Sequence, residues 1–252
     1  MSLPAIGIVT GAAGGIGKAV ALSLAARGVD LVVTDLSESA LAALSREGAA
    51  LAGRMLAVAG DIVDPTLGAQ LVEATTKTFG KPSLLVNCAG YLQDARIQKM
   101  NPQHFDRLIA INLIGPLRVA DTVLRSMSGV AWGRIILLSS RAWLGNFGSS
   151  GYSAAKGGIV GATRNLALAY ASTGITVNCI APGFIDTPMA RSLPPTILQR
   201  VVAAIPVGRT GTVEDVSALV HYLADSGSGY VTGQTLVACG GRSLTGPISK
   251  SL

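Results

Sequence analysis

Residues 6 to 17 read Ile6-Gly7-Ile8-Val9-Thr10-Gly11-Ala12-Ala13-Gly14-Gly15-Ile16-Gly17, and this stretch decides the fold. Its first five residues predict a short buried strand, and a helix is predicted to open near Lys18. Glycines in the turn between them let the backbone bend tightly and approach a pyrophosphate, whose charge then rests on the helix N-terminus. A glycine-rich turn alone is about equally consistent with a nucleotide-binding turn and with a plain strand-to-helix connection. The surrounding sequence has to distinguish the two.

The alternation of strand and helix continues along the whole chain. Six further strand candidates cover residues 31–35, 54–59, 84–87, 134–139, 175–181 and 235–238. Helical stretches include residues 16–27, 66–79, 105–127 and 152–171. Strands and helices in this order are joined by right-handed crossovers and form a parallel sheet covered on both faces. The sequence therefore predicts one doubly wound α/β domain over residues 1–252, with residues 188–206 as an excursion of its own.

The composition argues against several classes of protein. The 252 residues are 49% hydrophobic and 13% charged, which indicates a sizeable core, but polar residues interrupt every apolar run before it reaches membrane-spanning length. The first strand begins too early for a signal peptide to precede it. Cys88, Cys179 and Cys239 are widely spaced and there are two histidines, so we expect neither disulfides nor a metal site, and a cytoplasmic protein.

The net charge of +6 at pH 7 raises the question of a nucleic-acid partner. The 20 lysines and arginines are scattered along the chain, without basic runs or interleaved aromatic residues. A recognition surface for nucleic acid needs clustered basic residues. We therefore expect no nucleic-acid binding.

Asp35 ends the second predicted strand, where it can select the cofactor. A carboxylate at this place accepts hydrogen bonds from the adenosine ribose hydroxyls of a dinucleotide and would repel a 2′-phosphate. The neighbouring positions, where a cation would favour NADP, hold Gly14 and Leu36. We predict NAD rather than NADP.

Tyr152 and Lys156 lie four residues apart on a predicted helix, in Gly151-Tyr152-Ser153-Ala154-Ala155-Lys156-Gly157. This spacing puts both side chains on one helix face, where an ammonium can favour the deprotonated phenol. The pair is a candidate general acid and base, although the spacing also arises by chance on helix surfaces.

Besides these features, the chain contains a series of further short motifs, which follow one another from the N-terminus onward. They are Thr10-Gly11-xxx-Gly15-x-Gly17, Asp61-Ile62, Asn87-Cys88-Ala89-Gly90, Ile111-Asn112-Leu113, Gly133-Arg134-Ile135-Ile136-Leu137-Leu138-Ser139-Ser140, Tyr152-xxx-Lys156 and Pro182-Gly183-Phe184-Ile185-Asp186-Thr187. In this pattern the chain resembles the short-chain dehydrogenase/reductase family over nearly its whole length. The resemblance implies a Rossmann fold with a seven-stranded parallel sheet, one nicotinamide cofactor and, from the family's usual assembly, a homotetramer.

The resemblance also implies roles for single residues. Tyr152 would exchange a proton with the substrate oxygen, and Lys156 would lower the tyrosine pKa and hold the nicotinamide ribose. Ser140 would hydrogen-bond the substrate oxygen, and Asn112 would position a water that connects Lys156 to solvent. The expected cofactor-binding residues are Gly11, Gly15, Ile16, Gly17, Asp35, Leu36, Asp61, Ile62, Asn87, Ala89, Gly90, Tyr152, Lys156, Pro182, Gly183, Ile185 and Thr187.

Two positions depart from the family pattern. Cys88 stands where the family usually has a second asparagine. The alignment along the fifth strand selects Ser140 as the catalytic serine, whereas the commoner family spacing before Tyr152 selects Ser139. Adjacent strand residues point to opposite faces, so one of the two serines alone can serve, and we favour Ser140.

The closest overall pattern is that of 3-oxoacyl-[acyl-carrier-protein] reductases. Those enzymes dock an acidic carrier protein through basic residues before the fifth and sixth strands, where this chain has Ser126-Met127-Ser128 and Ser172-Thr173, with Arg125 nearby. We therefore expect a small alcohol or ketone as substrate, with the carrier-protein reductase as the alternative. A catalytically idle nucleotide-sensing or scaffold protein is a remote third reading.

Specificity for the substrate is expected from a mostly apolar set of residues. The set comprises Tyr91, Arg141, Trp143 and Asn146, and the 188–206 segment with Met189 and Leu193. Arg141 could pair with a carboxylate of the protein or contact an anionic substrate, and the sequence leaves both possibilities open.

Overall fold

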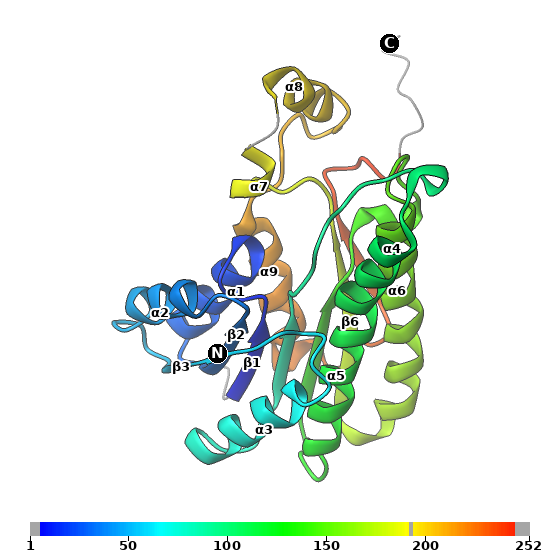
Figure 1. Cartoon of the computed structure of the whole chain (residues 1–252). Coiled ribbons are helices and arrows are strands. Elements are labelled where there is room, and N and C mark those ends of the chain that lie inside the picture. The colour runs from blue at the N-terminus through cyan, green and yellow to red at the C-terminus, as the bar shows by residue number, and fades with distance from the viewer. Residues whose placement is uncertain (1–5, 192–193, 245–252) are drawn as a thin grey trace.

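The computed structural model describes residues 6–191 and 194–244, which form one parallel sheet with helices on both sides (Figure 1). The strands are β1 (Ile6–Thr10), β2 (Asp30–Asp35), β3 (Met55–Ala59), β4 (Leu84–Asn87), β5 (Gly133–Leu138), β6 (Ile175–Pro182) and β7 (Thr235–Ala238). Their order across the sheet is β3-β2-β1-β4-β5-β6-β7. The predicted doubly wound Rossmann fold is confirmed, and each strand was placed to within one residue at either end.

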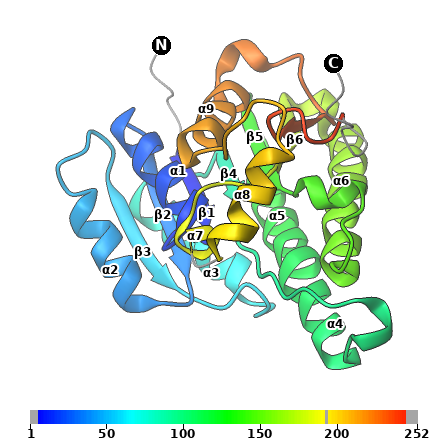
Figure 2. The same cartoon turned by 90° about the horizontal axis from the view of Figure 1, so that it is seen from above.

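The helices cover the two faces of the sheet in separate groups (Figure 2). On one face α1 (Gly15–Ala26), α2 (Glu38–Glu47) and α9 (Val213–Ala224) pack over a core that includes Val33, Leu84 and Val86. On the other face α3 (Leu67–Thr78), α5 (Gly115–Ser126) and α6 (Ser150–Tyr170) pack over a core that includes Ile8, Leu85 and Ile135. Burial on both faces explains why the strands are continuous apolar runs rather than alternating ones.

The prediction of one long helix over residues 105–127 is wrong in one respect. The structure has α4 (Pro102–Ile109), then one π-helical turn, η2 (Ala110–Ile114), and then α5. A π-turn adds one residue to a helix without ending it, so the sequence reading took the whole stretch as one regular helix. The 188–206 excursion contains two helices, α7 (Pro188–Arg191) and α8 (Pro195–Ala203), and α2 and α9 were not among the predicted stretches.

No helix within residues 6–191 and 194–244 is both long enough and apolar enough to cross a membrane.

The strand order places a binding site at the carboxyl ends of the strands. The sheet grows in opposite directions from β1, with β2 on one side and β4 on the other. In open α/β sheets a crevice forms at such a switch point, outside the carboxyl ends of the strands. The turns after β1, β2, β4, β5 and β6 therefore meet on the edge where the sequence predicted the cofactor.

Candidate active site

The glycine-rich turn after β1 is packed too closely for any larger residue at two of its glycines. Gly11 has φ +63°, and a Cβ added there would lie 2.7 Å from the backbone of Ala89. A Cβ on Gly17 would lie 2.0 Å from the carbonyl oxygen of Gly11. Gly15 also has a positive φ of +48°, and the half-buried Ile16 packs against the core beneath α1. The turn therefore presents bare backbone at the N-terminus of α1, which suits a pyrophosphate.

A hydrogen-bond network fastens this turn to the turn after β4. The Thr10 hydroxyl donates to Oδ1 of Asn87 at 2.6 Å and accepts from the backbone N–H of Ala89 at 3.2 Å. The Asn87 amide donates to the carbonyl of Pro116 at 3.0 Å, which ties the turn to α5. Both side chains are buried, so these bonds satisfy groups that would otherwise destabilise the fold. The sequence reading included Asn87 and missed Thr10 as its partner.

Asp35 stands at the carboxyl end of β2, where its Oδ2 accepts the backbone N–H of Ala13 at 3.0 Å. Leu36, next in the chain, is 69% exposed, and Gly14 is exposed. Lys18, a nearby basic residue, pairs with Glu47 at 2.6 Å. The surroundings of Asp35 therefore keep the features that led to the prediction of NAD.

The remaining predicted cofactor residues lie on the flanks of this edge. Asp61 is exposed and accepts the Val63 N–H at 3.1 Å, while Ile62 is buried. A Cβ on Gly115 would lie 2.4 Å from the Ile62 carbonyl oxygen, so α5 begins directly against this turn.

The turn after β6 closes the site from the other side. Pro182 is the buried last residue of β6, and a Cβ on Gly183 would lie 2.7 Å from Cα of Cys239. Ile185 is buried and pairs with Gly211 in an isolated bridge. The Thr187 methyl would lie 3.3 Å from a Cβ on Gly15, so this turn rests on the glycine-rich turn.

The two serines after β5 have different partners. The Ser140 hydroxyl accepts the Ala142 N–H at 3.2 Å and lies close enough to the Tyr152 phenol to lower its pKa. The Ser139 hydroxyl is buried and donates to the backbone carbonyl of Lys156 at 2.8 Å. Ser139 therefore fastens β5 to α6, and Ser140 faces the phenol.

The electrostatics of Tyr152 differ from the expectation that Lys156 lowers its pKa. Burial raises the pKa of the Tyr152 phenol, the Ser140 hydrogen bond lowers it, and the negative charge of Asp94 raises it. Burial lowers the pKa of Lys156 to about 8. Its Nζ donates to the Leu138 carbonyl at 2.9 Å and lies 5.6 Å from the centre of the Tyr152 ring. The ammonium of Lys156 thus bonds the end of β5, and burial is the main cause of the shift in the Tyr152 pKa.

Asn112 lies in the π-turn, and both the oxygen and the nitrogen of its side-chain amide are hydrogen-bonded to the backbone. Its Nδ2 donates to the carbonyls of Tyr91 at 2.8 Å and Leu108 at 3.1 Å, and its Oδ1 accepts the Tyr91 N–H at 3.1 Å. A Cβ on Gly90 would lie 3.1 Å from Oδ1 of Asn112 and 3.5 Å from Nζ of Lys156. Gly90 therefore leaves the gap across which Asn112 and Lys156 face each other.

The loop after β4 carries a residue that the sequence reading missed. Asp94 accepts a short hydrogen bond from the hydroxyl of Ser149, just before α6, and Ala95 pairs with Ser149 in an isolated bridge. The contact holds this loop against the end of α6 that bears Tyr152. An acidic residue in a loop carries no spacing signal, so the sequence offered no means of finding it.

The expected specificity residues also lie at this end of the molecule. Tyr91 donates to Gln93 at 2.8 Å, with the Arg107 guanidinium 5.3 Å from the centre of its ring. Arg141 donates to Oδ1 of Asn146 at 3.2 Å, and the half-buried Trp143 packs against the second core. Leu193 and the side chain of Met189 lie outside the described residues.

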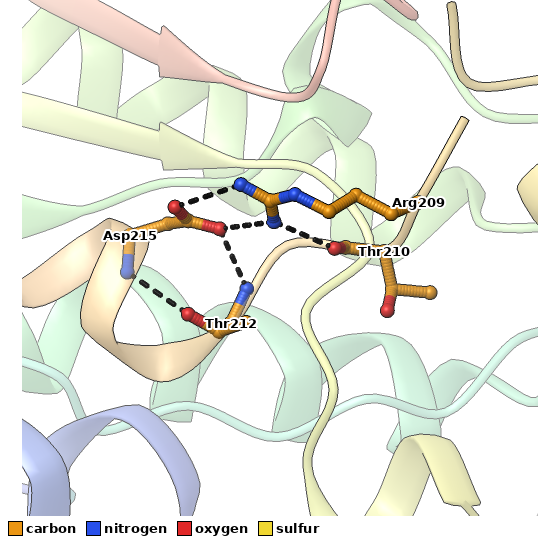
Figure 3. Close-up of polar contacts among 4 residues, drawn as sticks. All are labelled: Arg209, Thr210, Thr212 and Asp215. Carbon is orange, nitrogen blue, oxygen red and sulfur yellow. Dashed lines mark hydrogen bonds and ion pairs between the residues drawn. The ribbon is translucent and has the colours of Figure 1, made fainter. Parts of the chain in front are cut away.

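A cavity of about 350 Å³ lies between the turn after β6, the approach to α9 and the end of β7. Apolar residues including Ile185, Ile205 and Val207 line it, and Arg209 and Asp215 form its polar wall. Figure 3 shows this wall, in which Arg209 bonds both carboxylate oxygens of Asp215. Neither Ser140 nor Tyr152 lines the cavity. The cavity is therefore separate from the candidate proton-transfer groups.

Comparison with known proteins identifies the family to which the chain belongs. A family model described as Enoyl-(Acyl carrier protein) reductase matches residues 11–243. 3-Oxoacyl-[acyl-carrier-protein] reductase FabG of Escherichia coli K12 is 38% identical over 238 residues, which cover 94% of this chain and 96% of FabG. The chain belongs to the short-chain dehydrogenase/reductase family of nicotinamide-dependent oxidoreductases, as the sequence motifs predicted.

Particular relatives differ in the substrates that their names carry. The (2S)-[(R)-hydroxy(phenyl)methyl]succinyl-CoA dehydrogenase subunit BbsD of Thauera aromatica is 39% identical over 239 residues, 95% of this chain and 96% of BbsD. A solved actinorhodin polyketide ketoreductase with NADPH superposes with a TM-score of 0.91 at 30% identity, over 97% of this chain and 99% of that one.

Proposed function

We propose that this protein is an NAD-dependent oxidoreductase that interconverts a secondary alcohol and a ketone. The observation that carries the reaction is the Ser140 hydroxyl beside the half-buried Tyr152 phenol, whose pKa it lowers, at the edge where the glycine-rich turn meets the turns after β4 and β6. A bound nicotinamide would supply the hydride acceptor or donor. The chain's own residues supply the proton and the site for the oxyanion.

Tyr152 is the proposed proton carrier. Its phenol stays protonated at neutral pH because burial raises its pKa, so it is ready to donate to a carbonyl oxygen as that oxygen gains charge. The Ser140 hydroxyl stabilises the same oxygen by a second hydrogen bond. Asn112 and Lys156 face each other across Gly90 and provide the proposed path by which the phenol recovers its proton.

The preference for NAD rests on Asp35. Its carboxylate is fixed by the Ala13 N–H, and the adjacent Leu36 side chain offers a 2′-phosphate no cation. FabG and the ketoreductase that was solved with NADPH are similar proteins, so selectivity between the two cofactors is the part of the proposal most open to test.

Reduction of a 3-oxoacyl thioester is the second candidate, favoured by the names of FabG and of the CoA-ester dehydrogenase BbsD. Basic residues that could steer an acidic carrier protein are scarce just before β5, between residues 126 and 132. Arg125 pairs with Asp121 at 2.9 Å, and Lys81 donates to the Ser128 carbonyl at 3.3 Å. Weak steering of this kind favours a free small molecule over a carrier-bound chain.

A homotetramer is part of the proposal as well. Leu168 on α6 is 82% exposed, and Ile114, just before α5, is 41% exposed. Burial of such residues against a second copy would remove apolar area from water. Light scattering at micromolar concentration tests the assembly, and a monomer would contradict it.

A panel of secondary alcohols and ketones, each with NAD(H) and NADP(H), tests the function. We expect turnover with higher kcat/KM for NAD(H). Tight NAD binding without any turnover would favour the third reading, a nucleotide-sensing or scaffold protein. Higher efficiency with NADPH would overturn the cofactor assignment.

Two serine variants test the proton-transfer group. Ser140→Ala should lower kcat by roughly 10²-fold or more, because the hydrogen bond to the developing oxyanion is lost. Ser139→Ala should chiefly lower the melting temperature, since its hydroxyl joins β5 to α6. A large loss of kcat confined to Ser139→Ala would reverse the assignment.

A further inference from the structure

Ser149, the residue just before α6, has a buried hydroxyl that does not cap the helix. The residue is 1% exposed and occupies the N-cap position of the helix that bears Tyr152. A serine at this position normally accepts a backbone N–H of the first turn through its hydroxyl. Thr212 does so at the start of α9. Among the described residues, the Ser149 hydroxyl accepts no N–H of the first turn of α6.

The Ser149 hydroxyl bonds two other segments of the chain instead. It donates a short hydrogen bond to Oδ1 of Asp94, in the loop after β4. It accepts Nδ2 of Asn146 at 2.9 Å, and Oδ1 of the same amide accepts Nη2 of Arg141 at 3.2 Å. One hydroxyl, acting as donor and as acceptor, therefore links the loop after β4, the start of α6 and the segment after β5.

Each of these three segments is attached to a member of the proposed proton-transfer group. Ser140 lies in the segment after β5, and Tyr152 lies three residues after Ser149, in the first turn of α6. The loop after β4 begins at Tyr91, whose backbone N–H and carbonyl both bond the Asn112 amide. The position of the Ser149 hydroxyl therefore affects how the three groups lie relative to one another.

Further contacts join the same two loops around this hydroxyl. The backbones of Ala95 and Ser149 pair in an isolated bridge, and the Arg96 guanidinium lies 4.6 Å from the centre of the Phe147 ring. Phe147 is exposed, so water competes with the outer contact. The bond between Ser149 and Asp94 is the part of the joint that begins at a buried group.

We propose that Ser149 and Asp94 are positioning residues, whose hydrogen bond holds the first turn of α6 so that the Tyr152 phenol meets the substrate oxygen. The inference rests on the proposed alcohol and ketone chemistry and adds two residues that act through Tyr152. Proton transfer requires a donor within about 2.6–3.2 Å of the acceptor atom. A misplacement of about 1 Å can lower a rate by on the order of 10²-fold.

Variants of both partners test the proposal in the full chain, with NAD and the alcohol of highest kcat/KM in the panel. Ser149→Ala and Asp94→Ala should each lower kcat, measured on the plateau of its pH profile, by roughly tenfold, the loss expected from a displacement of less than 1 Å. The dissociation constant of NAD should stay unchanged. Asp94→Asn keeps an acceptor for the Ser149 hydroxyl and should retain the plateau kcat. The double alanine variant should be no slower than the slower single variant, because both changes remove the same bond.

Ser228→Ala is the matched control. Ser228 is 3% exposed, and its hydroxyl donates to the carbonyls of Leu223 at 3.0 Å and Asp225 at 2.8 Å, beyond the C-terminal end of α9. This variant also removes a buried hydroxyl with two partners, so it should lower Tm. Because Ser228 is remote from Tyr152 in the fold, kcat should be unchanged.

An unchanged kcat in both Ser149→Ala and Asp94→Ala would overturn the proposal and leave the oxidoreductase function intact. Losses that multiply in the double variant, or an equal loss of kcat in Ser228→Ala, would overturn it as well. Absence of turnover by the unmodified protein with every member of the panel would overturn both this proposal and the proposed function. Asp94 is exposed, so Asp94→Ala decides the matter even where Ser149→Ala does not fold.

Discussion

Lys156 is a buried cation that the structure supports with few contacts. It is 3% exposed, and its ammonium donates to the carbonyl of Leu138. Burial lowers its pKa from 10.5 to about 8, so the folded state holds the charge at a cost. An ionisable group that is costly for stability and set beside Tyr152 is typical of a functional site.

Lys156→Met should therefore stabilise the protein while it abolishes activity. The lowered pKa corresponds to about 3 kcal/mol below pH 8, and we expect a rise in Tm on the order of 10 °C at pH 7. A group with a lowered folded pKa contributes least below that value, so the advantage of the variant should shrink as pH rises from 8 to 10.5. Calorimetry across this range measures it. Lys77→Met, at an exposed position, should show no such trend, and a lower Tm for Lys156→Met at pH 7 would contradict the prediction.

Asp94 sets the charge near Tyr152 from a different part of the chain. Because its carboxylate raises the pKa of the phenol, Asp94→Asn should lower that pKa. The rising limb of kcat/KM for alcohol oxidation should then move to lower pH. Asparagine can still accept the Ser149 hydrogen bond, so the loop contact is kept. Ser149→Ala removes the hydrogen bond to Asp94 and leaves the Asp94 charge in place. If the rising limb of kcat/KM also moves to lower pH in this variant, the position of the loop, rather than the charge of Asp94, sets the pKa of the phenol.

At the scale of elements, the caps and turns do most of the positioning. α9 begins at a capping box in which the Thr212 hydroxyl accepts the Asp215 N–H and the Asp215 carboxylate accepts the Thr212 N–H (Figure 3). The same carboxylate pairs with Arg209, which lowers the pKa of Asp215 to about 2. One acidic residue thus holds the start of α9 and the wall of the cavity.

Asp215→Ala should lower the free energy of unfolding by about 1 kcal/mol at pH 7, because the Thr212 N–H loses its acceptor in the capping box. A carboxylate with a lowered folded pKa loses its contribution as pH falls, so the difference from the unmodified protein should diminish below pH 3.8 and vanish toward pH 2. Urea unfolding at several pH values measures it. Asp121→Asn breaks an exposed ion pair without a cap and should cost less than about 0.5 kcal/mol. An equal cost for the two variants would contradict the role of the cap.

The sequence was sufficient for the strands and insufficient for the irregular elements. β1, β4 and β7 were placed at their observed bounds because each is a short apolar run between turn residues. The π-turn around Asn112 was missed because it depends on a side chain that bonds the Tyr91 and Leu108 carbonyls, which no periodicity encodes.

At the scale of the whole molecule, the candidate active site is formed by turns that lie far apart in the sequence. Their order along the chain does not indicate which of them are in contact. The glycine-rich turn meets Ala89 and Thr187. The family resemblance named both as cofactor-binding residues, but it predicted no contact between them and that turn.

Cofactor selectivity belongs to this scale, because binding of a dinucleotide adds to the stability of the fold. A ligand at about 100 times its Kd stabilises by about 2.7 kcal/mol, which should raise Tm by several degrees. We expect NAD to produce a larger rise than NADP at equal concentration. Asp35→Asn keeps an acceptor for the Ala13 N–H but removes the charge, so it should narrow the difference between the two cofactors. A larger rise with NADP for the unmodified protein would show that Asp35 does not select the cofactor.

The π-turn at Ala110–Ile114 also fixes the length of the chain between α4 and α5. A π-turn holds one residue more than a regular helical turn, so deleting one residue here would restore a regular helix and keep the orientation of α5. Each residue of an α-helix advances the rotation by about 100°, so inserting a residue here would turn the downstream helix as a unit. Val119, Ala120 and Val123, which now face the core, would be carried toward solvent. A single-residue insertion in the π-turn should therefore be far more damaging than a single-residue deletion at the same place, although the sequence there reads as an ordinary amphipathic helix.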